Sequence, residues 1–295
     1  MKALKLLTDH FPVLKLHITV RLNRSARFPA FKGSMLHGWF GQVVKNYDGR
    51  LYHILFGVHD NRQPKPYVIC PSGDHKQEWQ QGELFSFELS LFGEAVQCGE
   101  SVVDAITTAA THKHLGLGKH NVPFELLSVA SVTPYGLRPN IIVSQLGEWL
   151  TTLPQASIIE QEFSLLFETP VRVKYQGKVC HHAVPHLDFW CTQIMRRLTG
   201  LSRFWVVEDD ALFDAMYIEA HKALTGTQQV AEHCYWEDWQ RFSFKHQSHL
   251  PFGGIKGQLS FYGEVYGIVP LLKVGELLHI GGKTTFGLGK YQLIV

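Results

Sequence analysis

The chain has 295 residues, 45% of them hydrophobic, which is enough to bury a sizeable core and to form two domains. Its formal net charge is only +2 at pH 7, so any contact with nucleic acid must come from local basic clusters rather than from bulk positive charge. The five cysteines include no C-x-x-C pair and no apolar run is long enough for a membrane span, which argues against a disulfide framework, a cysteine-ligated zinc ion and a membrane partner, and favours a cytoplasmic protein.

The first half of the chain contains a regular succession of strand and helix patterns. Residues 13–22 alternate with period two, which predicts a strand, and residues 35–45 carry apolar side chains at helical spacing after a candidate cap, Ser34. Further along, the pattern predicts strands at 66–69 and 84–92, a helix at 101–111 and a closing strand at 122–129. This order of strand, helix, strand, strand, helix, strand is typical of the ferredoxin-like fold.

The second half repeats this order less regularly. The pattern predicts an opening strand around 164–174, helices at 186–204 and 210–224, paired strands at 239–246 and 255–265, a helix at 271–279 and a final strand. Prolines and a glycine between residues 134 and 161 mark a boundary. We therefore predict an α+β fold of tandem ferredoxin-like (RRM-like) domains, at 1–135 and 160–295.

A glycine-rich signature occurs once in each half. Leu115-Gly116-Leu117-Gly118-Lys119-His120 is echoed by Phe286-Gly287-Leu288-Gly289-Lys290-Tyr291, and an apolar run follows each copy. The two copies indicate a duplicated module. Glycines allow a backbone to approach an anion closely, and the second copy also carries lysines and threonines, so we expect it to contact phosphates. Its plain alternative is a tight turn in a packed hairpin, and for the first copy the two interpretations are evenly balanced.

Several motifs, taken in order, resemble one known family. They are Phe31-Lys32-Gly33-Ser34-Met35-Leu36-His37-Gly38, Leu89-Ser90-Leu91-Phe92-Gly93-Glu94-Ala95, Phe167-Glu168-Thr169-Pro170-Val171-Arg172, Gly253-Gly254-Ile255-Lys256-Gly257 and the glycine-rich tail. This series resembles the CRISPR-associated repeat-processing endoribonucleases of the RAMP superfamily, the Cas6 family. One departure is that the tail has His279 where the family usually has the first glycine of a Gly-x-Gly pair.

The resemblance implies a reaction and a substrate. The protein would bind CRISPR repeat RNA and cleave precursor crRNA without a metal ion or other cofactor, by attack of the RNA's own 2′-hydroxyl, leaving a 2′,3′-cyclic phosphate and a 5′-hydroxyl. Such a reaction needs a base, an acid and a cation beside the phosphate. His37 is the first candidate for proton transfer and His53 the second, with Lys45 or Lys32 as the cation. Each histidine has a structural alternative, as a packed or a surface side chain.

The resemblance also places the RNA-binding residues. These would be the tail loop, which we expect to be a flexible cradle, and two arginines on the polar side of the helix at 186–204; together they are Gly281, Gly282, Lys283, Thr284, Thr285, Gly287, Gly289, Lys290, Arg196 and Arg197. A solvated helix face is the commoner explanation for the arginines.

Two further alternatives bear on function. His181, His182 and His186 have a spacing that metal ligands can have, but Pro185 interrupts any regular helix there, so we expect no metal site. The chain could also be a non-catalytic RAMP subunit that binds guide RNA in a CRISPR effector complex. The glycine-rich loop serves both functions, whereas His37 distinguishes them.

Overall fold

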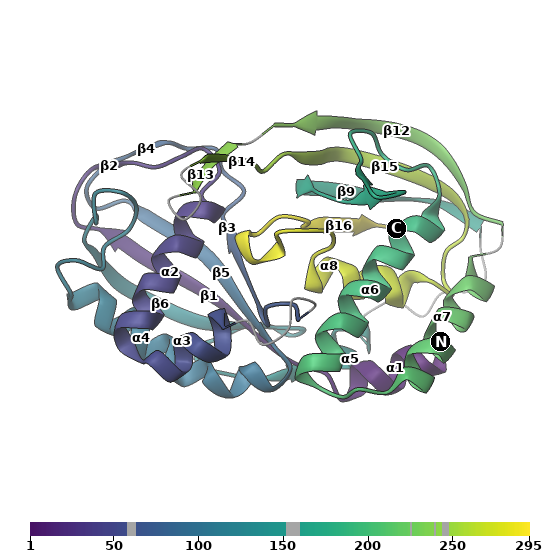
Figure 1. The fold of residues 1–295 in the computed structure, drawn as a ribbon, viewed down its shortest axis with the longest axis horizontal. Coiled ribbons are helices and arrows are strands. Elements are labelled where there is room, and N and C mark those ends of the chain that lie inside the picture. The colour runs from purple at the N-terminus through teal and green to yellow at the C-terminus, as the bar shows by residue number, and fades with distance from the viewer. Residues whose placement is uncertain (58–62, 152–159, 225, 239, 244–247) are drawn as a thin grey trace. The chain divides into compact units, whose positions relative to one another are not determined.

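The computed structural model describes the chain except for residues 58–62, 152–159, 225, 239 and 244–247, and only the backbone of 240–243 and 248–250. It divides into two compact units. The N-terminal unit comprises Phe11–Trp149 with Leu201–Val207, and the C-terminal unit comprises Met1–His10, Leu150–Gly200 and Glu208–Val295. Each unit has its own sheet and helices (Figure 1). The units differ from the predicted ranges because the first ten residues belong to the second unit and 201–207 to the first.

The N-terminal unit is built on an antiparallel sheet with strands in the order β3-β5-β1-β6. Relative to the order of strands in the chain this is 2-3-1-4, as the predicted ferredoxin-like unit requires. Its main elements are β1 (Pro12–Leu22), α2 (Gly33–Tyr47), α3 (Gly49–Phe56), β3 (Tyr67–Pro71), β5 (Leu84–Phe92), α4 (Gly99–Thr111) and β6 (Phe124–Thr133). Short additions are β2 (Ala26–Arg27), β4 (Glu78–Trp79), β7 (Gly136–Arg138), β8 (Ser144–Gln145) and α5 (Leu146–Thr151).

The core of this unit lies between the sheet and helices α2 and α4, which cover one face (Figure 1). Every second residue of β1 from Leu14 to Leu22 is fully buried, because successive side chains of a strand point to opposite faces. Helix α4 buries Val102, Ala105, Ile106 and Ala109, one stripe at helical spacing. Burial of such apolar stripes provides about 25 cal/mol per Å² of stabilisation.

The C-terminal unit repeats the same topology. Its antiparallel sheet has the order β12-β15-β9-β16, again 2-3-1-4 along the chain. The main elements are β9 (Glu160–Val171), α6 (Leu187–Trp205), α7 (Asp210–Ala223), β12 (Gln228–Glu237), β15 (Gly254–Glu264), α8 (Val269–Leu278) and β16 (Tyr291–Ile294). Two small hairpins accompany them, β10 (Lys174–Tyr175) with β11 (Lys178–Val179), and β13 (Gln240–Ser243) with β14 (Ser248–Pro251).

Phe167 shows how the second core is packed. Its ring lies 4.8 Å from that of Trp190 on α6 and 6.3 Å from that of Tyr291 on β16, with all three side chains buried. Both units thus have the predicted fold, and the predicted α+β class is confirmed. Each glycine-rich signature occupies the same topological place, between the last main helix of its unit (α4 or α8) and the last main strand of the sheet (β6 or β16).

Two local predictions were wrong. Ser34 is not a cap: Lys32 holds the N-cap position of α2, without a side-chain cap bond, and Ser34 lies inside the first turn. Strand β15 pairs with β12, which the sequence pattern missed because its polar and apolar residues alternate irregularly, and not with the segment around 240–243, which pairs with β14. The predicted strand at 239–246 lies partly outside the described residues.

The sequence pattern also missed the amino-terminal helix α1 (Lys2–Asp9). Its apolar face buries Ala3, Leu4 and Leu7, and the backbone N–H of Ala3 donates to Glu219 of α7 at 3.1 Å. This helix therefore completes the C-terminal unit. Along with the other described helices, it is not both long and apolar enough to cross a bilayer.

Candidate functional site

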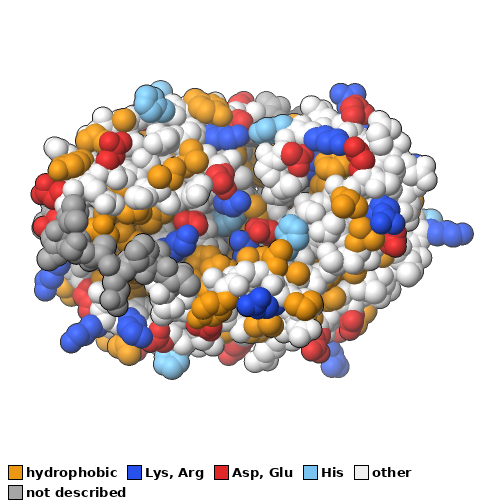
Figure 2. Space-filling view, turned by 180° about the vertical axis from the view of Figure 1, so that it is seen from behind, with side chains coloured by type: hydrophobic (Ala, Val, Ile, Leu, Met, Phe, Trp, Pro, Cys, Tyr) orange, Lys and Arg blue, Asp and Glu red, His pale blue; other side chains and the backbone are white. Residues whose placement is uncertain are grey.

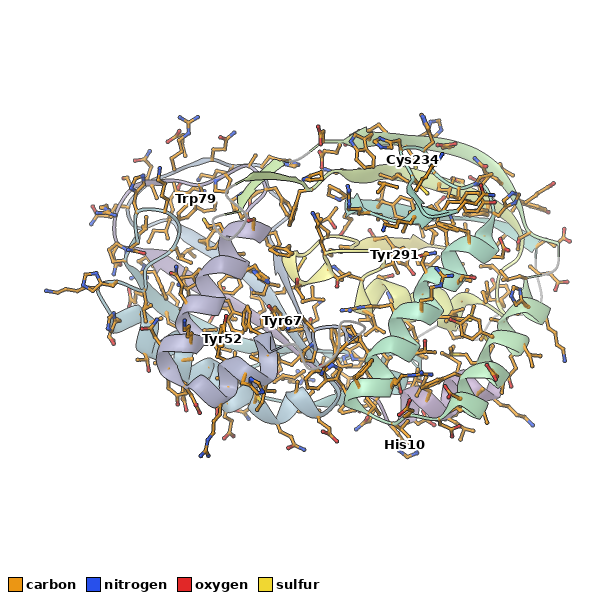
Figure 3. The ribbon with its side chains drawn as sticks, viewed as in Figure 1. His10, Tyr52, Tyr67, Trp79, Cys234 and Tyr291 are labelled. Carbon is orange, nitrogen blue, oxygen red and sulfur yellow. The ribbon has the colours of Figure 1, made fainter. Side chains whose placement is uncertain are left out.

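His37 lies in the first half of α2, half-buried among aromatic rings. Tyr67, on β3, is labelled in Figure 3. Its hydroxyl lies 3.1 Å from His37 Nε2, and the two rings stack with centroids 6.1 Å apart. The ring of Phe56, from α3, meets the imidazole edge-on at 5.5 Å. The phenol therefore fixes the orientation of the imidazole, and Tyr67 is a residue that sequence reasoning missed: a tyrosine in a short apolar strand carries no signal of its partner.

Tyr67 keeps its proton throughout the neutral range. Burial, followed by the nearby charge of Tyr52, raises the pKa of this phenol well above its ordinary value of 10.0. A neutral phenol can donate to Nε2 of a neutral imidazole or accept from it, depending on the tautomer. Tyr67 is itself fully buried, so it acts on its surroundings through His37.

Lys45 lies on the same side of α2 as His37 but is not brought next to it. The two residues are eight positions apart, which is about 12 Å along the helix axis. The ammonium of Lys45 lies 5.9 Å from the ring centre of Tyr52, and Tyr52 stacks on Phe56 at 5.0 Å. Two stacked rings therefore separate the lysine from the histidine, and a ligand would have to bridge them.

His53 occupies the last turn of α3 and is exposed. The buried residues of α3 are Leu51 and Leu55, and Tyr52 and Phe56 contact Lys45 and His37 of α2. The structure thus places the second proton-transfer candidate on the same helix pair as His37, but on the solvent side.

Lys32, the competing cation, has a structural task. Its side chain is 0% exposed and pairs with Asp74 at 2.8 Å, and its ammonium also donates to the Asp74 carbonyl at 3.0 Å. Partial burial alone would raise the pKa of Asp74, but hydrogen bonds from Lys32 and Ser72 and the charge of Lys32 lower it below its ordinary value. Because the ammonium is enclosed, the interpretation of Lys32 as a phosphate ligand is wrong. Lys45 remains the candidate cation.

The glycine-rich loop of the C-terminal unit, residues 279–290, is held along both arms. Ile280 donates from its backbone N–H to the carbonyl of Gly289 at 3.0 Å, which joins the arms. Gly289 donates to Pro170 at 3.1 Å, and Gly282 donates to Arg172 at 2.8 Å. The end of β9 and the residue that follows it thus hold the loop, and the expected flexible cradle is instead a backbone with fixed hydrogen bonds.

Side chains complete this attachment. The hydroxyl of Thr169 donates to the carbonyl of Gly287 at 2.8 Å and accepts from the backbone N–H of Lys290 at 2.9 Å. His279, where the family usually has glycine, has φ +59°, and its Nδ1 lies 3.1 Å from the carbonyl of Leu288. A carbonyl only accepts, so Nδ1 carries the proton. Where a glycine would leave the turn without a side chain, His279 adds a hydrogen bond across the loop.

The outer end of the loop is a short turn, Thr284–Phe286, preceded by Lys283 at φ +63°. The backbone N–H groups of Thr284 and Thr285 begin this turn, and within the described part of the chain no group accepts from them. Lys283 contributes a charge, and its ammonium donates to the carbonyl of Pro251 and lies 4.3 Å from the ring centre of Phe252. Lys290 pairs with Glu168 at 2.9 Å. The predicted loop residues are therefore together, with Gly282 the exposed glycine.

The two arginines of α6 have different surroundings. Arg196 is exposed, as expected for a polar helix face. Arg197 departs from that expectation: burial lowers the pKa of its guanidinium to about 10, and its Nε donates to the carbonyl of Leu278 at 3.2 Å. Leu278 ends α8, whose last carbonyls have no partner within the helix. Arg197 thus anchors the start of the glycine-rich loop.

The first glycine-rich copy is a closed turn in the N-terminal unit. Leu117 and Val122 exchange backbone hydrogen bonds of 2.9 and 2.8 Å. Beside the turn is a cavity of about 350 Å³, and its lining includes Arg24, Arg27, Lys119 and His120 and no carboxylate. The turn itself is structural, while the cations beside it form a small basic pocket.

Charge elsewhere is mixed. On the face in Figure 2, lysine and arginine side chains are interspersed with aspartate and glutamate rather than gathered into one field, as the net charge of +2 suggests. Outside the residues left undescribed, no group of three or more histidine, cysteine, aspartate or glutamate side chains could hold a metal ion.

The fold and the loop define a class, the RAMP-type proteins with two ferredoxin-like units. Residues 165–291 match the family model described as CRISPR-associated endoribonuclease Cas6, and residues 11–155 match a model described as an N-terminal domain. The match to the C-terminal part of the chain supports the predicted relationship to the Cas6 family. No curated protein matches it in sequence.

Solved structures share the fold over nearly the whole chain. One is a partial Cas6-RT-Cas1–Cas2 complex, with a TM-score of 0.65, 14% identity and coverage of 97% of this chain. Our chain spans 46% of that longer protein. A Cas6 product complex has a TM-score of 0.61 and 14% identity, covering 96% of this chain and 100% of that one. A Thermus thermophilus Cas6 has a TM-score of 0.57 and 13% identity, covering 96% of this chain and 99% of that one.

Proposed function

We propose that this protein is a metal-independent endoribonuclease that binds CRISPR repeat RNA and cleaves precursor crRNA. The observation that carries the proposal is His37, held by the neutral phenol of Tyr67 at 3.1 Å on the first main helix of a chain whose C-terminal part matches the Cas6 family. An imidazole in a fixed orientation is suited to proton transfer near pH 7. The match to an endoribonuclease family supplies the substrate class, and the similar Cas6 product and substrate-mimic complexes support it.

The proposed reaction needs only groups of the chain and the RNA. His37 takes the proton of the 2′-hydroxyl, and the oxygen attacks the adjacent phosphorus. The bond to the 5′-oxygen breaks as that oxygen receives a proton from the second proton carrier, His53. The products are a 2′,3′-cyclic phosphate and a 5′-hydroxyl. His53 is the proposed second proton carrier. Lys45 would have to approach the phosphate from the other side of the bound RNA, because two aromatic rings separate it from His37.

The glycine-rich loop is the proposed grip on the RNA. Two N–H groups at the start of its outer turn, with the half-buried Thr285 hydroxyl and the charge of Lys283, are donors that suit phosphate oxygens, whereas the Thr284 side chain is buried. The pocket with Arg24, Arg27 and Lys119 adds a second phosphate contact in the N-terminal unit. The cleaved RNA would pass to other CRISPR proteins, the partners that similar structures suggest.

The test uses repeat RNA in EDTA, with a second RNA that carries a deoxy-sugar at the cut position. We expect single-turnover cleavage of the first and none of the second, since attack requires the 2′-hydroxyl. His37→Ala should abolish cleavage and leave the affinity for repeat RNA unchanged. Activity that EDTA removes, or cleavage of the deoxy RNA, would overturn the mechanism.

A non-catalytic RAMP subunit is the second candidate. It is favoured by the separation of Lys45 from His37 along α2, since a binding protein needs no cation beside a proton carrier. Tight binding of repeat RNA without cleavage, under all the conditions above, would select it.

A further inference from the structure

A groove of about 930 Å³ in the C-terminal unit lies outside the loop and the catalytic candidates. Its walls are the β10–β11 hairpin and the first half of α6, and its lining includes Lys174, Tyr175, His186, Phe189, Thr192 and Arg196. Sites for small ligands usually enclose about 300–1,000 Å³, so the groove has room for a nucleotide.

The hairpin is rigid enough to form a wall. Lys174 pairs with Val179 and Tyr175 with Lys178, and the two turn residues have positive φ angles, +49° at Gln176 and +80° at Gly177. Two consecutive positive φ angles define the tight type I′ turn, whose twist matches the strands it joins. The turn therefore sets the position of Tyr175 beside the groove.

Tyr175 presents an aromatic surface to solvent. Its side chain is 47% exposed, although its ring meets that of Phe189 on α6 at 5.8 Å and 75°. An edge-on neighbour of this kind holds a ring in place without covering it by stacking. An ordered, exposed ring in a groove is the feature on which unpaired nucleobases stack.

Charge and hydrogen-bonding groups complete a nucleotide site. Lys174 and Arg196 are exposed on opposite walls, and Asp188 is the one carboxylate in the lining. Phosphate would lie between the two cations. Thr192, with the amides of Gln176 and Gln193, offers donors and acceptors for a base edge or a 2′-hydroxyl.

Both walls lead directly to the glycine-rich loop. Arg172, whose carbonyl accepts from Gly282, is two residues before Lys174, at most about 7 Å of extended chain. On the other wall, Arg196 precedes Arg197, which anchors the end of α8 at Leu278. The groove and the loop are thus neighbouring parts of one surface within the C-terminal unit.

We propose that the groove binds one unpaired ribonucleotide of the RNA strand that the loop grips, with its base stacked on Tyr175 and its phosphate between Lys174 and Arg196. This rests on the proposed function only in taking RNA as the ligand. The groove needs only to bind RNA, so the experiments can reject the proposed nucleotide site and the proposed cleavage independently of each other.

The test combines protein variants with RNA variants. Repeat RNAs, each with one abasic position, are bound to the His37→Ala protein with and without Tyr175→Ala, and affinities are measured by fluorescence anisotropy. We expect Tyr175→Ala to weaken binding by about 10-fold to 100-fold. At one position, removing the base should lower the affinity for the protein that keeps Tyr175 but not for the Tyr175→Ala variant. This dependence of one loss on the other indicates direct stacking.

Controls separate stacking from folding and from bulk charge. Tyr175→Phe keeps the ring and should bind normally. Lys174→Ala with Arg196→Ala should weaken binding, whereas Lys178→Ala, which removes a charge from the same hairpin but not from the groove lining, should have little effect. The proposed nucleotide site would be overturned if the losses of affinity from Tyr175→Ala and from an abasic position were additive at every position. It would also be overturned if the protein did not bind repeat RNA. Coupling at one position without cleavage by the unmutated protein would support the groove and reject the proposed function.

Discussion

At the residue scale, the environment of a side chain decided what the sequence could only suggest. His37 and Lys32 are five positions apart, and the sequence made the first a candidate for proton transfer and the second a candidate cation. The structure encloses Lys32 in contacts with Asp74 and leaves His37 half-buried beside Tyr67. Neither partner is visible in sequence, because Asp74 and Tyr67 lie 42 and 30 residues away. Candidate residue types could be predicted from the sequence, while their roles depended on long-range packing.

Tyr67→Phe tests the orienting role of the phenol, since it removes only the hydroxyl that lies 3.1 Å from His37. We expect the single-turnover cleavage rate to fall by about tenfold, the worth of one hydrogen bond, with RNA affinity unchanged. Tyr52→Phe is the matched control, because its ring stacks on Phe56 beside the same cluster. An unchanged rate, or an equal loss in both variants, would count against a positioning role for Tyr67.

Asp74→Asn tests the enclosed ion pair. The pKa of Asp74 is lowered in the folded protein, so its stabilising contribution is present above the ordinary value of 3.8 and is lost as the pH falls through the lowered value. Urea unfolding at pH 7 should show a loss of about 1 kcal/mol, a modest figure because the carboxylate is partly exposed. The difference between variant and unmutated protein should shrink in acid below pH 3.8. A pH-independent difference would mean that the charge of Asp74 is not the cause. Glu83→Gln, at an exposed pair with Lys76, should change stability little.

At the scale of elements, strands and helices with strong periodicity were predictable. The strand at 84–92 and the helix at 210–224 agree with the structure to within a residue. Strand β12 was missed because its residues alternate between half-buried and exposed, without fully buried apolar positions that would mark one face. The glycine-rich loop was found by composition alone, but its hydrogen bonds to the segment 169–172 depend on tertiary structure.

Gly289→Ala tests that fixed loop. Gly289 has φ +79°, and an added Cβ would lie 1.9 Å from the carbonyl oxygen of Ile280. We expect a loss of about 2 kcal/mol or more in the free energy of unfolding, measured by urea denaturation. Gly282→Ala is the control in the same loop: nothing lies closer than 3.6 Å to its added Cβ, so stability should change by less than about 0.5 kcal/mol. Equal effects would contradict the packing described for residues 279–290.

At the scale of the whole molecule, duplication was predictable from the two glycine-rich signatures, and the matching strand orders agree with it. What could not be predicted is that each unit is assembled from separate stretches of chain. Trp205, beyond the predicted boundary, belongs to the N-terminal unit, where its indole N–H donates to Pro64 at 2.9 Å. Helix α1 likewise belongs to the C-terminal unit. When a segment belongs to the unit formed mainly by the other half of the chain, no periodic pattern in the sequence indicates it.

A fragment of residues 150–295 tests this assembly, because it lacks helix α1. Its thermal midpoint should rise when residues 1–10 are added as a peptide, since Leu4 and Leu7 each gain about 1.5–3 kcal/mol on burial. A Leu4→Asp peptide is the control and should have no effect. A midpoint that the unmutated peptide leaves unchanged would show that α1 is dispensable to the C-terminal unit.

The hydrogen bonds of the loop at 279–290 have a last consequence. When a ligand meets a segment whose shape is already set, the entropy of ordering that segment has been lost during folding and not on association. Conformational adaptation then falls mainly on the transcript. Selectivity among transcripts should therefore follow how readily each one bends to the contour of the protein, as well as which bases it carries.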